Sequence, residues 1–284
     1  MNIPRPKFDN LPLRQGDPKC SAWGLWGSDD ELGTLNLITE DIRRAAALEV
    51  KLGKAINLNL PLNVPLKPMN PRRKPCAHTL IPKEHANDDE FYNGVTQEDI
   101  SDIATHPIAT RGVLLDWYSY AIKHNIPHTP FTNQHIPLSQ LLIVAQEEGV
   151  TFRKGDVLLI RTGWTDAYYK LSEEEKDKLG GRDDRASIGV EATEECIRWH
   201  WEHEFAAVAS DTVAYEAWPS PKSWGVCMHE VFLSGWGMPI GECWDLEELS
   251  ATCAKVSRWT FMLTSQPLYL PGGVASPPNA IAIF

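Results

Sequence analysis

Two short apolar runs decide the fold class: Gly112-Val113-Leu114-Leu115-Asp116 and Val157-Leu158-Leu159-Ile160-Arg161. Each run is bounded by turn-forming residues and lacks polar alternation, which is the pattern of a strand buried on both faces. Helical patterns stand next to them at Trp117–His124 and at Leu138–Glu148. Because strand and helix patterns alternate without a break in composition, the sequence predicts an α/β fold in a single domain over residues 1–284.

The remaining elements follow from local signals. Ser172 with Glu175, and Asp245 with Glu248, have the spacing of a capping box at a helix start. Residues 1–38 are rich in Pro, Gly and Trp without a period, so we expect an extended N-terminal wrap. The other predicted helices are Glu40–Leu52, Val190–His203, one ending near Gly180 and one reaching Ala254, and the other predicted strands are Ile56–Leu60, Phe205–Ser210, Trp259–Thr264 and Ala280–Phe284.

The composition and net charge of the chain indicate which kinds of binding partner it disfavours. The 284 residues include 27 Lys+Arg and 38 Asp+Glu, a formal charge of −11. Such a chain repels phosphate backbones and anionic bilayers, so we expect a small-molecule substrate and no nucleic-acid or membrane partner. The six cysteines form no C-x-x-C pair, and the N-terminus lacks the apolar stretch of a signal peptide. We therefore expect a cytoplasmic protein with reduced thiols.

Several common catalytic motifs are absent from the sequence. It has no G-x-G-x-x-G, no Walker P-loop and no G-x-S-x-G. His229-Glu230 begins like H-E-x-x-H, but the fifth position is Leu233. His200 and His203 lie three residues apart, among tryptophans and carboxylates, which favours a partly solvated helix face over a metal site.

Six segments carry a resemblance to a known family: WGSDDELGTLNLIT (26–39), RGVLLD (111–116), FRKGDVLLIRTGW (152–164), FAAVASDTVAYEAWP (205–219), MHEVFLSGWGMPIGECWDLEEL (228–249) and PGGVASPPNAIAIF (271–284). They resemble the cyclase family, a group of metal-dependent hydrolases that includes bacterial kynurenine formamidases, and in particular its fungal branch. The resemblance implies a swivelling β/β/α domain that forms a homo-oligomer. It also implies a hydrolase or cyclase, with arylformamidase activity as the prototype, acting on a small aromatic or polyketide-like metabolite.

The resemblance also supplies candidate site residues. His229 and Glu242 match the family's later metal ligands, and Glu216 is a candidate carboxylate that either supports a metal ligand or faces the substrate. The family's earlier cluster, H-x-G-T-H-x-D-x-P-x-H or W-D-G-x-x-H, is missing, because His85–Glu90 runs directly into Phe91. We therefore expect Zn²⁺ or Mn²⁺ to bind weakly or not at all. Residues that could complete a ligand set are His78, His85, Asp88, Asp89, Glu90 and His106.

These residues also have structural interpretations. His229 could cap or pack a helix, Glu242 could pair with a basic neighbour, and Glu216 could be an ion-paired loop residue. Three functions remain open from the sequence. The first is a metal-dependent hydrolase or cyclase acting on an amide, formamide or lactone carbonyl. The second is a catalytically silent ligand-binding or oligomer-partner protein, and the third is a metal-independent cyclase or dehydratase.

Overall fold

The computed structural model describes residues 4–69, 73–76, 107–268 and 275–284. Its centre is a seven-stranded sheet with the order β1-β9-β8-β2-β4-β6-β7. Four strands are parallel to one another: β2 (Ile108–Leu115), β4 (Val157–Ile160), β6 (Ala207–Ser210) and β7 (Ile240–Gly241). Three antiparallel strands extend the sheet beyond β2: β8 (Thr260–Ser265), β9 (Ala280–Ile283) and β1 (Ala55–Asn57). A separate small sheet pairs β3 (His135–Ile136) with β5 (Gly189–Val190). This confirms the predicted α/β class.

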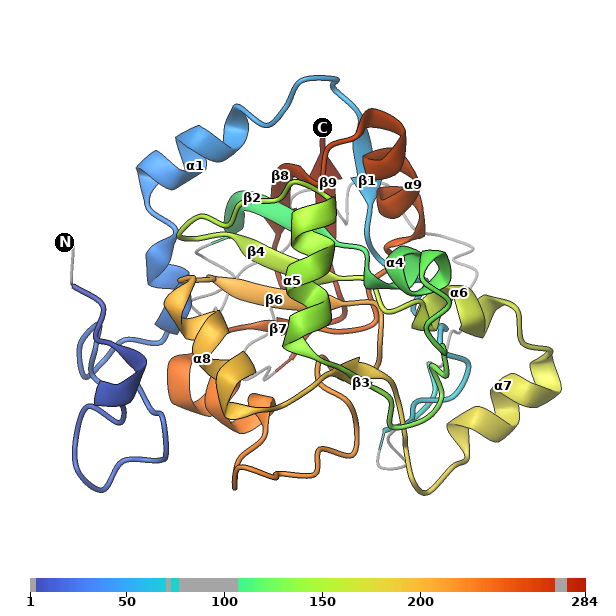
Figure 1. Ribbon diagram of the computed structural model, residues 1–284, viewed down its shortest axis with the longest axis horizontal. Coiled ribbons are helices and arrows are strands. Elements are labelled where there is room, and N and C mark those ends of the chain that lie inside the picture. The colour runs from blue at the N-terminus through green and yellow to red at the C-terminus, as the bar shows by residue number, and fades with distance from the viewer. Residues whose placement is uncertain (1–3, 70–72, 77–106, 269–274) are drawn as a thin grey trace, which may run out of the picture.

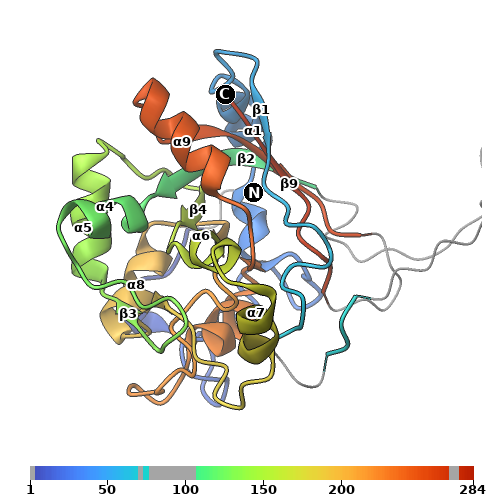
Figure 2. The ribbon, with the colours of Figure 1, turned by 90° about the vertical axis from the view of Figure 1, so that its right-hand side faces the viewer.

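The α-helices lie around this sheet, with α4 and α5 together on one side of β2 and β4 (Figure 1, Figure 2). Among the described residues, no helix is both long and apolar enough to cross a membrane. The helices are α1 (Glu40–Ala47), α4 (Trp117–Lys123), α5 (Leu138–Glu147), α6 (Trp164–Tyr169), α7 (Glu173–Gly180), α8 (Glu194–Glu202) and α9 (Glu247–Val256), with short helical turns η1 (Phe8–Asn10), η2 (Gly33–Leu37) and η3 (Glu230–Gly235).

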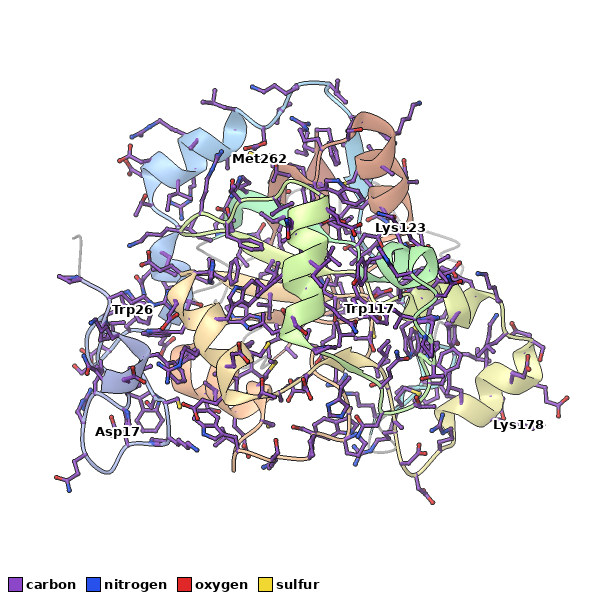
Figure 3. The ribbon with its side chains drawn as sticks, in the orientation of Figure 1. Asp17, Trp26, Trp117, Lys123, Lys178 and Met262 are labelled. Atoms are coloured by element: carbon purple, nitrogen blue, oxygen red, sulfur yellow. The ribbon has the colours of Figure 1, made fainter. Side chains whose placement is uncertain are left out.

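Both faces of β4 are buried, as its apolar run predicted. Leu158 and Ile160 of β4 pack with α5, α8 and many aromatic side chains in one cluster. Val157 and Leu159 pack on the opposite face with α9, η2 and β1. All four side chains are at most 2% exposed. Figure 3 shows the contrast with the periphery, because Trp117 lies inside while Lys178 extends into solvent from α7.

The N-terminal segment lies against α8 and η3. Trp201 Nε1 donates to the carbonyl of Pro6 at 2.9 Å, and Trp236 Nε1 donates to that of Cys20 at 2.9 Å. Thr34 Oγ1 donates to the carbonyl of Ala206 at 2.7 Å, beside the start of β6. These contacts attach an irregular segment to the core through side-chain donors rather than through sheet pairing.

Several predicted boundaries differ from the structure, and β2 begins at Ile108 rather than Gly112. The first predicted helix ends at Ala47 rather than Leu52. Strand β1 covers only Ala55–Asn57, because Asn59 bridges to Trp244 instead of continuing the β9 pairing. Val190 lies in β5, and α8 begins after Thr193, whose side chain caps Cys196 N–H. Helix α9 starts after Leu246 without a side-chain cap, whereas the predicted Ser172–Glu175 capping box is confirmed.

Candidate functional site

The imidazole of His229 lies between two carboxylates from different segments. Its Nδ1 is 2.7 Å from Glu216 Oε2, and its Nε2 is 2.8 Å from Glu242 Oε1. The His229 backbone N–H also donates to Glu216 Oε1 at 3.3 Å. The structure therefore brings together all three site residues that the sequence singled out. We call Glu216, His229 and Glu242 the carboxylate–histidine triad.

Three separate local structures position the triad. His229 immediately precedes η3, a short π-helical turn of a kind often found at functional sites. Glu242 follows directly after β7. Glu216 is held by backbone bonds to β5, because Val190 N–H donates to the Tyr215 carbonyl and Ala217 N–H to the Val190 carbonyl.

The close approach of β5 to Glu216 explains the glycine at position 189. A Cβ on Gly189 would lie 2.3 Å from the backbone of Glu216, which no side chain could accommodate without moving that segment. Glu216 itself is completely buried, whereas the side chains of His229 and Glu242 are each 28% exposed. The triad therefore has a buried end at Glu216 and an accessible end at Glu242.

Electrostatics favour a protonated His229 in the absence of a competing cation. Burial is the largest single influence and lowers the pKa, but hydrogen bonds and charges of Glu216 and Glu242 together outweigh it. The pKa of His229 is raised to about 10. At neutral pH the imidazolium therefore donates one hydrogen bond to each carboxylate.

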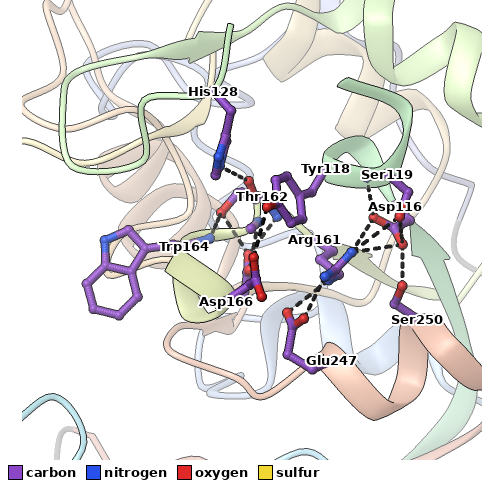
Figure 4. Close-up of polar contacts among 12 residues, drawn as sticks. Asp116, Tyr118, Ser119, His128, Arg161, Thr162, Trp164, Asp166, Glu247 and Ser250 are labelled. Carbon is purple, nitrogen blue, oxygen red and sulfur yellow. Dashed lines mark hydrogen bonds and ion pairs between the residues drawn. The ribbon is translucent and has the colours of Figure 1, made fainter. Parts of the chain in front are cut away.

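A second polar cluster follows the carboxyl ends of the parallel strands β2 and β4 (Figure 4). Arg161 Nη1 lies 3.0 Å from Asp116 Oδ1, and Arg161 Nη2 lies 2.6 Å from Glu247 Oε2. Asp116 also accepts hydrogen bonds from Ser119 and Ser250. Each charge has a partner, so this cluster anchors α4 and α9 to the strand ends. The sequence analysis missed it, although Asp116 and Arg161 both end predicted strands.

Asp211 occupies the equivalent position after β6. Its carboxylate accepts from the backbone N–H groups of Thr162 at 2.6 Å and Gly163 at 2.9 Å. Burial raises the pKa of Asp211 to about 6, because complete desolvation outweighs these hydrogen bonds. This carboxylate ties the turn after β4 to the segment that carries Glu216.

The triad fits a metal ion only in part. Imidazole nitrogen and carboxylate oxygen are donors that Zn²⁺ and Mn²⁺ accept, and a carboxylate on the other ring nitrogen commonly orients a ligating histidine. However, a catalytic zinc usually has three protein ligands, and no group of three or more His, Cys, Asp or Glu within the described residues could hold a metal ion. Further candidates named from the sequence lie outside the described residues: His78, His85, Asp88, Asp89, Glu90 and His106.

These contacts decide two of the structural interpretations. The basic neighbour that pairs with Glu242 is His229 itself, so that structural alternative is confirmed. His200 does not lie on a solvated face: it is completely buried, with its ring between the Cys196 carbonyl at 2.7 Å and Tyr215 Oη at 2.8 Å. Burial lowers the pKa of His200 to about 4, so it is a neutral core residue.

Comparisons with known proteins agree with this architecture. The family model described as "Putative cyclase" matches residues 84–217. The crystal structure of a novel cyclase shares 26% identity, with 93% of this chain and 99% of that chain covered and a TM-score of 0.74. Isatin hydrolase A from Labrenzia aggregata, bound to benzyl benzoate, shares 16% identity over 81% of this chain and 93% of its own, with a TM-score of 0.50. No curated protein matches the chain.

Proposed function

We propose that this chain is a hydrolase or cyclase, which its resemblance to the cyclase family, the family model over residues 84–217 and the solved cyclase structure support. Its substrate is a small aromatic or polyketide-like metabolite, and the reaction takes place at an amide, formamide or lactone carbonyl. The observation that carries the proposal is the His229 imidazole held between buried Glu216 and accessible Glu242. Such an arrangement supplies an oriented proton donor and acceptor at one point.

Each residue of the triad has a distinct part in the proposed reaction. Glu216 binds both the backbone N–H and Nδ1 of His229, so it fixes the plane of the ring. His229 presents Nε2 toward Glu242, where a proton is held between nitrogen and oxygen. Glu242, which solvent reaches, exchanges that proton with water or with the leaving group of the substrate.

The same donors define what a metal ion would bind. His229 Nε2 and a Glu242 oxygen would be two of its ligands, and Glu216 would keep its bond to Nδ1. A bound Zn²⁺ or Mn²⁺ would supply Lewis-acid polarisation of the substrate carbonyl. Because a metal ion must displace the proton from Nε2, and because the triad supplies two donors, we propose that binding is weak.

The test is hydrolysis of three probes, an aryl formamide, an aryl amide and an aromatic lactone, with and without added Zn²⁺ or Mn²⁺. We expect turnover of at least one probe. His229→Gln and Glu242→Gln should each lower kcat by about a hundredfold or more, because they remove the proton-transfer groups. Glu216→Gln should cost about ten- to a hundredfold, because it only orients the ring.

A matched control is available on the surface. His124 also contacts a glutamate, with Nε2 3.1 Å from Glu147 Oε1, but it lies just after α4 and its side chain is 40% exposed. His124→Gln should leave turnover unchanged. If none of the probes reacts, or if all triad variants keep the parent rate, the catalytic proposal is wrong and a ligand-binding role takes its place. A turnover rate that neither added metal nor chelator changes would instead identify a metal-independent enzyme.

A further inference from the structure

Trp218 lies beside the carboxylate–histidine triad, two residues after Glu216. The centroids of its indole ring and of the His229 imidazole are 6.4 Å apart, and the two ring planes are inclined at 64°. Among the described residues, no other aromatic ring and no cation lies against this indole. The imidazole covers at most one of the two indole faces, and Trp218 is partly exposed. An indole surface is therefore available next to the proposed proton-transfer groups.

The packing of Trp218 differs from that of the other tryptophans. Of the eleven in the chain, all but Trp23 and Trp218 belong to or pack against one of the two hydrophobic core clusters. Trp23 is exposed, and its Nε1 donates to the carbonyl of Ser234 at 2.7 Å. Trp218 is partly buried, and its Nε1 donates to no other described residue. The packing of the core therefore does not explain why a tryptophan stands at position 218.

The backbone on both sides of this indole is held by hydrogen bonds. Ser187 and Trp218 form an isolated antiparallel bridge, in which the N–H of each residue donates to the carbonyl of the other at 3.0 Å. The following carbonyl, that of Pro219, accepts from Asn133 Nδ2 at 2.9 Å. The attachment that holds Glu216 therefore continues through Trp218. A ring on such a fixed backbone loses little conformational freedom when a ligand binds, which favours affinity.

We propose that Trp218 determines the substrate specificity of the triad, because its indole ring packs against an aromatic ring of the substrate. Since the indole and His229 ring centroids are 6.4 Å apart, a carbonyl attached to that ring directly or through one atom would lie at His229 and Glu242. This inference rests on the proposed function and narrows its substrate class to compounds with an aromatic ring next to the reacting carbonyl. Aromatic rings attract one another beyond the effect of the area that they bury. Small-molecule sites typically combine such apolar surfaces with a few placed polar groups.

The test compares the binding of acetophenone and of cyclohexyl methyl ketone to the full chain by NMR titration. Both ketones carry the same carbonyl without a leaving group, so binding is measured apart from turnover. The saturated ring has the larger apolar surface, so burial alone would not favour acetophenone. We expect the parent to bind acetophenone about two- to tenfold more tightly. Trp218→Leu should abolish this preference, whereas Trp218→Phe, which keeps an aromatic face, should retain it.

Trp259→Leu is the matched control. Trp259 is also partly buried, but it packs against a core cluster and immediately precedes β8, which β2, β4 and β6 separate from β7. This variant should show the same preference as the parent. Absence of saturable acetophenone binding overturns the inference, as does a parent that binds the two ketones equally or prefers the saturated one. A preference lost equally in Trp218→Leu and Trp259→Leu also overturns it.

A purely structural role of Trp218 in holding His229 is distinguished by the same data. Such a role would weaken the binding of both ketones alike, and a preference that survives in Trp218→Leu overturns the inference. If Trp218→Leu fails to fold by circular dichroism, Trp218→Met decides, and an unchanged preference there overturns it. If the reaction probes show no turnover while the ketone preference depends on Trp218, the catalytic proposal is wrong and the aromatic site stands. Turnover together with a preference independent of Trp218 overturns only the role of Trp218.

Discussion

The buried carboxyl of Glu148 makes the free energy of unfolding depend on pH. In the folded state its pKa is raised by burial from 4.5 to about 9. A carboxyl with a raised folded-state pKa contributes its full stability below the unfolded pKa of 4.5, and that contribution is lost as the pH rises toward 9. At pH 7 the unfolded chain ionises Glu148 freely, whereas the folded chain keeps it protonated. Replacement by the neutral isostere in Glu148→Gln should therefore stabilise the fold.

The size of this effect follows from proton linkage. Between pH 4.5 and pH 7 each pH unit costs the folded state about 1.4 kcal/mol, which gives about 3 kcal/mol at pH 7. The side chain keeps some contact with solvent, so we expect a gain of about 1–3 kcal/mol at pH 7. The amide of Gln can still accept from the Asp116 N–H, as Glu148 Oε1 does. The gain should vanish near pH 4.

Urea denaturation of the parent and the variant at pH 4, 5, 6, 7 and 8 measures this difference. The neighbouring Glu147 is the control, because its pKa is lowered, first by its hydrogen bond to Lys123. Glu147→Gln should show the opposite trend, with no gain at pH 7. A Glu148→Gln variant whose stability differs from that of the parent by the same amount at every pH would refute the reasoning, because it would show that folding does not shift the pKa of Glu148.

Three further changes test the core, the ion cluster and the metal. Leu159→Ala should cost about 2–5 kcal/mol in urea denaturation, because the side chain is completely buried; a loss below about 0.5 kcal/mol would contradict its packing. Arg161→Met should cost about 3–5 kcal/mol by the same measurement, because it leaves Asp116 charged and buried, and an unchanged stability would count against the ion cluster. We expect EDTA to change the melting temperature little and elemental analysis to find less than one metal ion per chain. One equivalent of Zn²⁺ or Mn²⁺, lost on His229→Ala, would contradict that expectation.

The strands β2 and β4 could be predicted from the sequence because their uninterrupted apolar runs indicate burial on both faces. A run such as Val157–Ile160 places apolar side chains on both faces, and only a strand covered on both sides can use such a run. The β1 strand was predicted too long because its alternation continues through Leu60. The structure buries Leu58 and Leu60 beyond the end of β1, because after the bond from Leu58 N–H to the Ala280 carbonyl the chain leaves β9 and Asn59 bridges to Trp244. Apolar alternation indicates burial and does not show where the ladder with one partner strand ends.

Spatial partners could be predicted only in part. The resemblance supplied His229 and Glu242, and Glu216 was a candidate either to support a ligand or to face the substrate, but the sequence did not indicate that it binds the other nitrogen of the same ring. That contact depends on β5 lying against the Tyr215–Ala217 backbone, which is a long-range pairing of a two-residue strand. Short strands carry too few residues for a periodic signal.

The positions of the buried charges connect the fold to the proposed chemistry. Asp211 and Glu216 both lie in the chain that follows β6, and Asp211 accepts backbone hydrogen bonds from Thr162 and Gly163. This holds the start of that chain against the neighbouring strand β4, while β5 holds its end at Glu216. Between these two attachments, the buried carboxylate has little freedom to move away from His229. The rigid frame therefore keeps the ring oriented, and the exchangeable proton lies at the accessible Glu242 end, where a substrate can reach it.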